Sequence, residues 1–161
     1  MKNMTLPAKS CSILLCALLL LAAGCKKDEP TAPESLYGNV ENPTWTVPSD
    51  YDYTSSMTAV TKVASLNGQA VKDSIVNSSD LLAAFYGETC LGVASPQDGL
   101  FFLYVAQPIA NSQELTANIT LRYYSAHYKN IFEARDAFVF HNDDRLGTIA
   151  QPLTPPFKVV K

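Results

Sequence analysis

Histidine, cysteine and recognisable catalytic motifs are all scarce in this sequence. Its 161 residues include two histidines and four cysteines. It contains no HExxH, no G-x-S-x-G and no glycine-rich phosphate loop, which argues against the common metalloprotease, serine-hydrolase and nucleotide-binding classes. Paired catalytic carboxylates, as in glycosidases, have no sequence motif of their own, so a hydrolase is kept as an alternative. We expect a protein that is not an enzyme and needs no cofactor.

The N-terminal region lacks an apolar run long enough for a mature transmembrane helix. The run from Ile13 to Ala23 is shorter than the about 20 residues that a spanning helix needs. Lys2 and Lys9 precede it and small residues follow it, which is the order of a cleaved export signal. Leu21-Ala22-Ala23-Gly24-Cys25 resembles the lipobox of bacterial lipoproteins, where the leader is cut before the cysteine. We predict a lipoprotein signal peptide at 1–24, with a plain secretory signal as the alternative.

Cys25 is the predicted lipidation site and the predicted contact with the membrane. The resemblance implies that a diacylglycerol group alkylates its thiol, and several acyl chains hold a protein where one binds only marginally. Lys26-Lys27-Asp28-Glu29 follows and is similar to the surface-export signal of lipoproteins of the Bacteroidota. We therefore expect an outer-membrane lipoprotein that faces the cell exterior. Residues 25–44 are rich in proline and acidic side chains and are expected to form a flexible tether, which is also the simpler interpretation of the charge cluster.

Loss of the leader changes both the charge and the cysteine count. The net charge of −3 becomes −5, because Lys2 and Lys9 leave and ten basic residues then face fifteen acidic ones. This acidity argues against nucleic acid and anionic lipid as partners. Cys11 and Cys16 leave as well, so Cys90 has no partner for an intrachain disulfide once the anchor cysteine is acylated. We expect Cys90 to be a buried structural residue.

The remaining chain, 45–161, lacks an amphipathic helical pattern and reads as a β-protein. Residues 115–123 alternate strictly between apolar and polar side chains, as in a half-buried strand. Residues 56–66 form a second, weaker strand, which Asn67-Gly68 ends with the sequence of a type I′ turn. Residues 100–105 do not alternate, so we expect a central strand with both faces covered. Further short runs at 81–86, 89–94, 130–133, 137–140 and 157–160 bring the total to about seven or eight strands of an antiparallel β-sandwich.

Two glycines and a set of spaced motifs add to this prediction. Gly87 suits the turn of a tight hairpin, whereas Gly92 within a strand indicates a bulge or a close backbone approach. The order of motifs is similar to that of a module found in secreted and lipid-anchored surface proteins of the Bacteroidota, and the resemblance implies an immunoglobulin-like sandwich without a catalytic residue. Leu91 stands where that module more often has arginine. The motifs are 58–63, Asn67-Gly68, 80–85 with Gly87, Cys90, Gly92 and Val93, then 123–126 and 146–148.

Aromatic side chains are the predicted ligand-binding candidates. Flat rings with a polar tip suit both sugars and protein interfaces. Packing of these rings on the ends of the sandwich is the alternative. The candidates before the first strong strand are Trp45, Tyr51 and Tyr53, and those beside the turn at Ala126 are Tyr124 and Tyr128.

Metal ligands are suggested by one turn only. His141, Asp143 and Asp144 are the candidates, since they cluster an imidazole with carboxylate oxygens. The turn lacks the spaced D-x-D-x-D-G pattern of a calcium loop, and Asn and Asp are ordinary turn formers. We therefore expect no metal. The second histidine, His127, is expected in an exposed hairpin loop.

These observations lead to one function and two alternatives. We expect a lipid-anchored, surface-exposed and non-catalytic binding or accessory module that captures a glycan. The first alternative is a structural or protein-interaction component of a surface assembly, which would present a large apolar patch to one protein partner. The second is a hydrolase.

Overall fold

The computed structural model describes residues 35–51, 53–108 and 116–160, so the predicted leader, Cys25 and the first part of the predicted tether lie outside it. The described part is all-β, with eleven strands and one turn of 3-10 helix, η1 (Asp73–Ile75). It contains no helix with the length and apolarity to cross a membrane.

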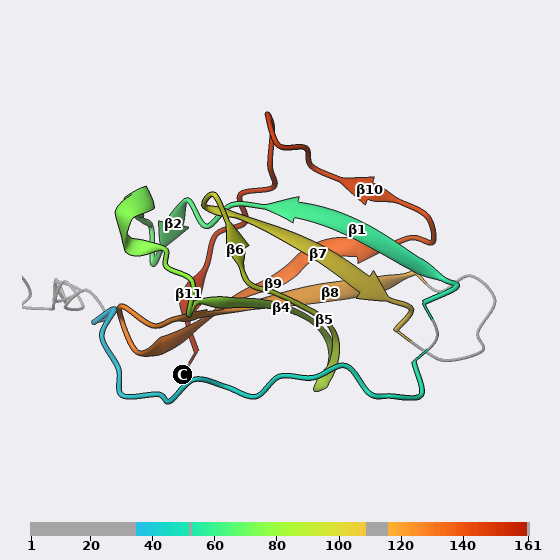
Figure 1. The fold of residues 1–161 in the computed structure, drawn as a ribbon, viewed down its shortest axis with the longest axis horizontal. Helices are drawn as coiled ribbons and strands as arrows, with labels where there is room; N and C mark the ends of the chain where they lie inside the picture. Colours follow the sequence, from blue (N-terminus) through green and yellow to red (C-terminus); the bar gives the residue numbers. More distant parts are fainter. Residues whose placement is uncertain (1–34, 52, 109–115, 161) are drawn as a thin grey trace, which may run out of the picture. The chain divides into compact units, whose positions relative to one another are not determined.

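Two packed sheets form the body of the domain (Figure 1). In the first sheet β1 and β7 are antiparallel, and β10 adds to β1 in parallel. Its strand order is β10 (Arg145–Leu146), β1 (Ser56–Thr61), β7 (Leu100–Ala106) and β6 (Pro96–Gln97). The order in the second sheet is β11 (Lys158–Val159), β9 (Asn130–Phe140), β8 (Ala117–Ser125), β4 (Leu81–Tyr86) and β5 (Thr89–Ala94). A small hairpin pairs β2 (Ser65–Leu66) with β3 (Gln69–Ala70).

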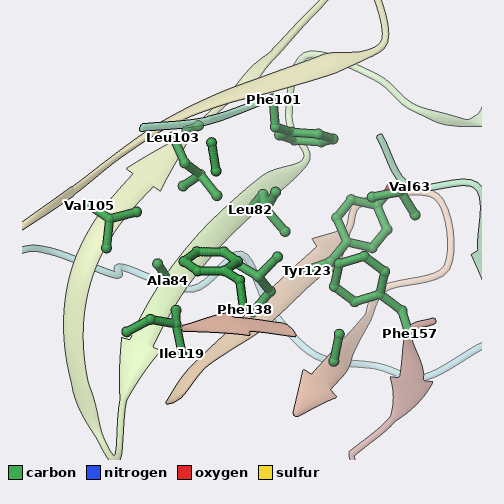
Figure 2. Packing of buried hydrophobic residues seen from close by; sticks show 14 of the residues in the cluster. Val63, Leu82, Ala84, Phe101, Leu103, Val105, Ile119, Tyr123, Phe138 and Phe157 are labelled. Atoms are coloured by element: carbon green, nitrogen blue, oxygen red, sulfur yellow. The ribbon is translucent and has the colours of Figure 1, made fainter. Parts of the chain in front are cut away.

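The core lies between the two sheets and follows the period-two rule of strands. Phe101, Leu103 and Val105 extend from β7 toward Leu82 and other apolar residues of the facing sheet (Figure 2). Burial of one such side chain contributes about 1.5–3 kcal/mol to folding. The predicted β-sandwich is therefore confirmed. Its immunoglobulin-like identity stays a prediction.

Two predicted strands have the observed bounds and the others differ from the structure. The strand predicted at 115–123 is β8, that at 100–105 is β7, and that at 157–160 contains β11. Residues 81–86 and 89–94 are β4 and β5 with the predicted bounds. The runs 130–133 and 137–140 belong to one strand, β9, which stays continuous because the register shifts where Ile119 and Leu121 of β8 face it. Residues 56–66 instead divide into β1 and β2.

Both turn and bulge signals are confirmed. Asn67 and Gly68 have φ values of 48° and 77°, the positive pair of a type I′ turn. Gly92 lies beside a register shift in the β4–β5 pair, and a Cβ atom at this position would overlap the carbonyl oxygen of Tyr104. The absence of a Cβ atom at Gly92 thus lets β5 approach β7 closely.

The expectation that β7 is covered on both faces is wrong. Phe102 and Tyr104 are 41% and 50% exposed, while Phe101, Leu103 and Val105 are buried. An apolar run without alternation therefore still alternates in burial, because the outward-facing positions happen to carry aromatic rings.

Residues 35–44, expected in the flexible tether, pack on the domain instead. The backbone amides of Gly38 and Val40 donate to the carbonyl oxygens of Tyr128 and Lys129, both at 2.9 Å. Leu36 packs against the main core. The chain then runs along the outer side of the five-stranded sheet (Figure 1). This placement corrects the predicted domain boundary at residue 45.

Candidate functional site

A group of exposed aromatic rings lies on the outer face of the first sheet. We call Tyr53, Phe102 and Tyr104 the aromatic strip. Tyr53 is 39% exposed, and its ring centroid is 5.1 Å from that of Tyr104 at an interplanar angle of 36°. The exposed parts of these rings can contact a flat apolar ligand surface.

The strand register explains why the strip is exposed. Phe102 and Tyr104 alternate with the buried residues of β7 and therefore extend away from the core. Their partners on β1 are Val60 and Thr58, respectively. These two side chains are short, so they flank the rings without covering them.

Tyr104 is held in place by its neighbours. The Ser56 hydroxyl donates a 2.9 Å hydrogen bond to the phenolic oxygen of Tyr104, and the Tyr53 ring packs beside it. A ring fixed in advance loses less side-chain entropy when a ligand binds. The strip can therefore bind a ligand by stacking.

Of the five predicted aromatic candidates, only Tyr53 belongs to the strip. Trp45 lies over the other sheet, where its ring packs edge-on against Phe85 at 5.7 Å. Tyr51 is half-buried against the main core, and its hydroxyl donates to the Pro108 carbonyl oxygen at 3.4 Å. These two residues have packing roles.

The expectation that Tyr124 and Tyr128 present exposed rings is contradicted by their burial. They are 5% and 9% exposed. The docked N-terminal segment is the reason, because the Tyr124 hydroxyl donates to the Val40 carbonyl oxygen at 3.5 Å and the Tyr37 ring packs edge-on against Tyr128 at 5.1 Å. Neither ring offers a face to a ligand.

The metal candidates lie in the turn between β9 and β10. Asp143 donates its backbone amide to the Ser56 carbonyl oxygen at 2.8 Å, and Asp144 Oδ1 accepts from the Arg145 amide at 2.8 Å. His141 is exposed. Within residues 35–51, 53–108 and 116–160, no three His, Cys, Asp or Glu side chains come together in a metal-binding group. The Asp144 carboxylate thus bonds to the backbone of the turn, whereas the Asp143 carboxylate bonds to the Asn142 side chain at 3.3 Å.

Cys90 and a network of charged side chains lie on the outer side of the second sheet. Burial raises the pKa of the Cys90 thiol, which makes it a poor nucleophile. Nearby, Arg122 lies over the Phe85 ring at 4.3 Å and binds Glu88 through two hydrogen bonds of 3.1 Å. This hydrogen bonding holds the pKa of the Glu88 carboxyl below its ordinary value. Glu133 completes the charge network with a 3.1 Å contact to Arg122.

Sequence reasoning missed Phe102 and Tyr104 because both lie in a run with no polar position to mark its solvent-facing side. The signal that could have found them is the partner strand. Thr58 and Val60 alternate with Met57 and Ala59, and antiparallel pairing of such a strand with β7 implies one exposed face.

Comparison of the chain with protein-family models, with curated proteins and with solved structures finds no match. No family is therefore shown, and the resemblance to surface proteins of the Bacteroidota stays a prediction.

Proposed function

We propose that this chain is a lipid-anchored, non-catalytic binding module that captures a glycan on the aromatic strip. The observation that supports it most directly is the exposure of Tyr53, Phe102 and Tyr104 on one sheet face, at 39%, 41% and 50%. Sugar rings carry apolar C–H faces with polar edges, and aromatic faces with phenolic tips complement both.

The proposed location follows from the sequence. The leader at 1–24 directs export, acyl groups on Cys25 attach the chain to the outer membrane, and Lys26-Lys27-Asp28-Glu29 directs it to the cell exterior. The proposed non-catalytic role is supported by the buried Cys90 thiol with its raised pKa and by the lack of any catalytic motif in the sequence.

The test is binding of the full-length lipoprotein, purified in detergent, to a panel of polysaccharides by affinity electrophoresis and calorimetry. Tyr104→Ala and Phe102→Ala should each weaken binding by about tenfold, since one ring contact contributes about 1.5 kcal/mol at most beyond its area burial. Tyr86→Ala is the matched control, because Tyr86 is a similarly exposed tyrosine on the other sheet, at 38%. Absence of binding to every polysaccharide, or equal losses in all three variants, would reject the proposal.

A protein partner is the alternative that a specific observation favours. Ile149 is 72% exposed in the segment between β10 and β11, which rises from the edge of the first sheet (Figure 1). An exposed apolar side chain of this kind can anchor a protein interface that does not include the strip. Crosslinking on intact cells that yields one protein partner, lost in Ile149→Ser but not in Tyr104→Ala, would establish this alternative.

A further inference from the structure

Arg145 lies in the same cross-strand row as the central ring of the strip. Thr58 pairs with Tyr104 on one side and with Arg145 on the other. Directly paired residues of neighbouring strands extend to the same face of a sheet. The row Arg145, Thr58 and Tyr104 therefore crosses the outer face of the first sheet.

The next residue confirms this orientation. Leu146 pairs with the buried Ala59 and packs against the main core. Because successive strand residues extend to opposite faces, Arg145 faces outward, and it is exposed. Two strand spacings, about 10 Å in total, separate its backbone from that of Tyr104.

The guanidinium of Arg145 has no ion-pair partner among the residues that the structure describes. Lys62, which follows β1 directly, instead contacts Asp73 at 3.0 Å. The nearest carboxylates in sequence bond to amides and not to the guanidinium. Asp143 Oδ2 accepts from the Asn142 side-chain amide at 3.3 Å, and Asp144 Oδ1 accepts from the Arg145 backbone amide at 2.8 Å. Among the described residues, Arg145 thus places a guanidinium that makes no ion pair beside the strip.

We propose that the strip selects an acidic glycan, whose carboxylate or sulfate group pairs with Arg145 while a sugar ring stacks on Tyr104. This inference rests on the proposed glycan-binding function and adds its ligand class. Arginine is suited to this role, because its planar fork of N–H donors matches a carboxylate or sulfate. Thr58 between the two residues adds a hydroxyl that can bond to sugar oxygens.

The test compares polygalacturonate, chondroitin sulfate and neutral xylan as ligands of the full-length lipoprotein in detergent. The wild-type chain should bind at least one acidic polymer, and Arg145→Gln should weaken that binding roughly five- to tenfold. Added salt should weaken wild-type binding more than binding by the variant. Binding of only the carboxylated or only the sulfated polymer supports the proposal and identifies the acidic group.

The control is Arg135→Gln, which removes an exposed arginine of β9 that already contacts Glu133 at 2.7 Å; it should bind like the wild type. Xylan binding that Tyr104→Ala weakens, without binding to either acidic polymer, would overturn the acidic class while the glycan function stands. Binding to no polymer would overturn both proposals. Equal acidic-polymer affinity of the wild type and Arg145→Gln would overturn the role of Arg145.

Discussion

The hydroxyl of Tyr123 donates a 2.6 Å hydrogen bond to Oδ2 of Asp80, and both side chains are fully buried. Oδ1 of the same carboxylate accepts from the Ala126 amide at 2.9 Å. Asp80 precedes β4, and Ala126 begins the turn after β8. One buried carboxylate therefore joins the start of one strand to the hairpin of the next.

Substitution of Asp80 should destabilise the domain strongly. Asp80→Ala leaves the Tyr123 hydroxyl and the Ala126 amide without their acceptor, and each buried group left unsatisfied costs about 1–3 kcal/mol. Urea unfolding at neutral pH measures the loss. The control is Asp73→Ala, which removes an exposed ion pair to Lys62 and should cost less than about 1 kcal/mol. Equal losses in the two variants would contradict a structural role for the buried carboxylate.

Tyr123 should also make the domain sensitive to alkaline pH. Burial, with the hydrogen bond to Asp80 in second place, raises the pKa of the Tyr123 hydroxyl far above its ordinary value. The unfolded chain therefore releases this proton first, and stability falls as pH rises above about 10 by up to about 1.4 kcal/mol per pH unit. Unfolding free energies at pH 8 to 11.5 should show this slope.

Two variants isolate the residue responsible. Tyr123→Phe should reduce the fall of the unfolding free energy with pH by the contribution of one proton, which is up to about 1.4 kcal/mol per pH unit. The thiol of Cys90 also has a raised pKa because of burial, so Cys90→Ala should remove a separate contribution that begins at lower pH. If Tyr123→Phe keeps the wild-type slope above pH 10, the proton comes from another group.

Gly92 should control the position of the strip through the backbone of β7. In Gly92→Ala the new methyl group meets the carbonyl of Tyr104, and because this neighbour is backbone, the strand has to move, at a cost of about 1–3 kcal/mol. Amide NMR shifts should change along β7. Gly68→Ala is the control, since it has positive φ but no atom within 4 Å. Its shift changes should stay near the β2–β3 turn, and a β7 unaffected by Gly92→Ala would contradict the close approach.

Local patterns were sufficient for much of the fold and for little of the site. β4 and β5 had predictable bounds because Gly87 and Glu88 separate two compact apolar runs at a turn. The exposure of Phe102 and Tyr104 was missed because it depends on which face of β7 meets the core. Tyr124 and Tyr128 were expected at the surface, yet residues some ninety positions earlier in the chain cover them. Such non-local contacts have no local periodicity to reveal them.

The docked N-terminal segment provides the last prediction. Gly38 lies so close to the β8–β9 turn that a Cβ atom would be 2.9 Å from both the Lys129 carbonyl oxygen and Cγ of Asn130. Gly38→Ala should therefore push the segment away and weaken the 2.9 Å bond from its amide to Tyr128. Hydrogen exchange should show loss of protection at Gly38 and Val40, while the amides of β8 and β9 stay protected.

The matched control is Asn39→Ala, because Asn39 is the exposed neighbour of Gly38 and its substitution adds no atom toward the turn. Its exchange pattern should equal that of the wild type. Undocking also uncovers Tyr128. An electrophile that modifies tyrosine rings should therefore react faster with Tyr128 in Gly38→Ala than in the wild type. Unchanged protection in Gly38→Ala would mean that packing of Leu36 and Trp45, rather than the hydrogen bonds to the turn, holds the segment on the domain.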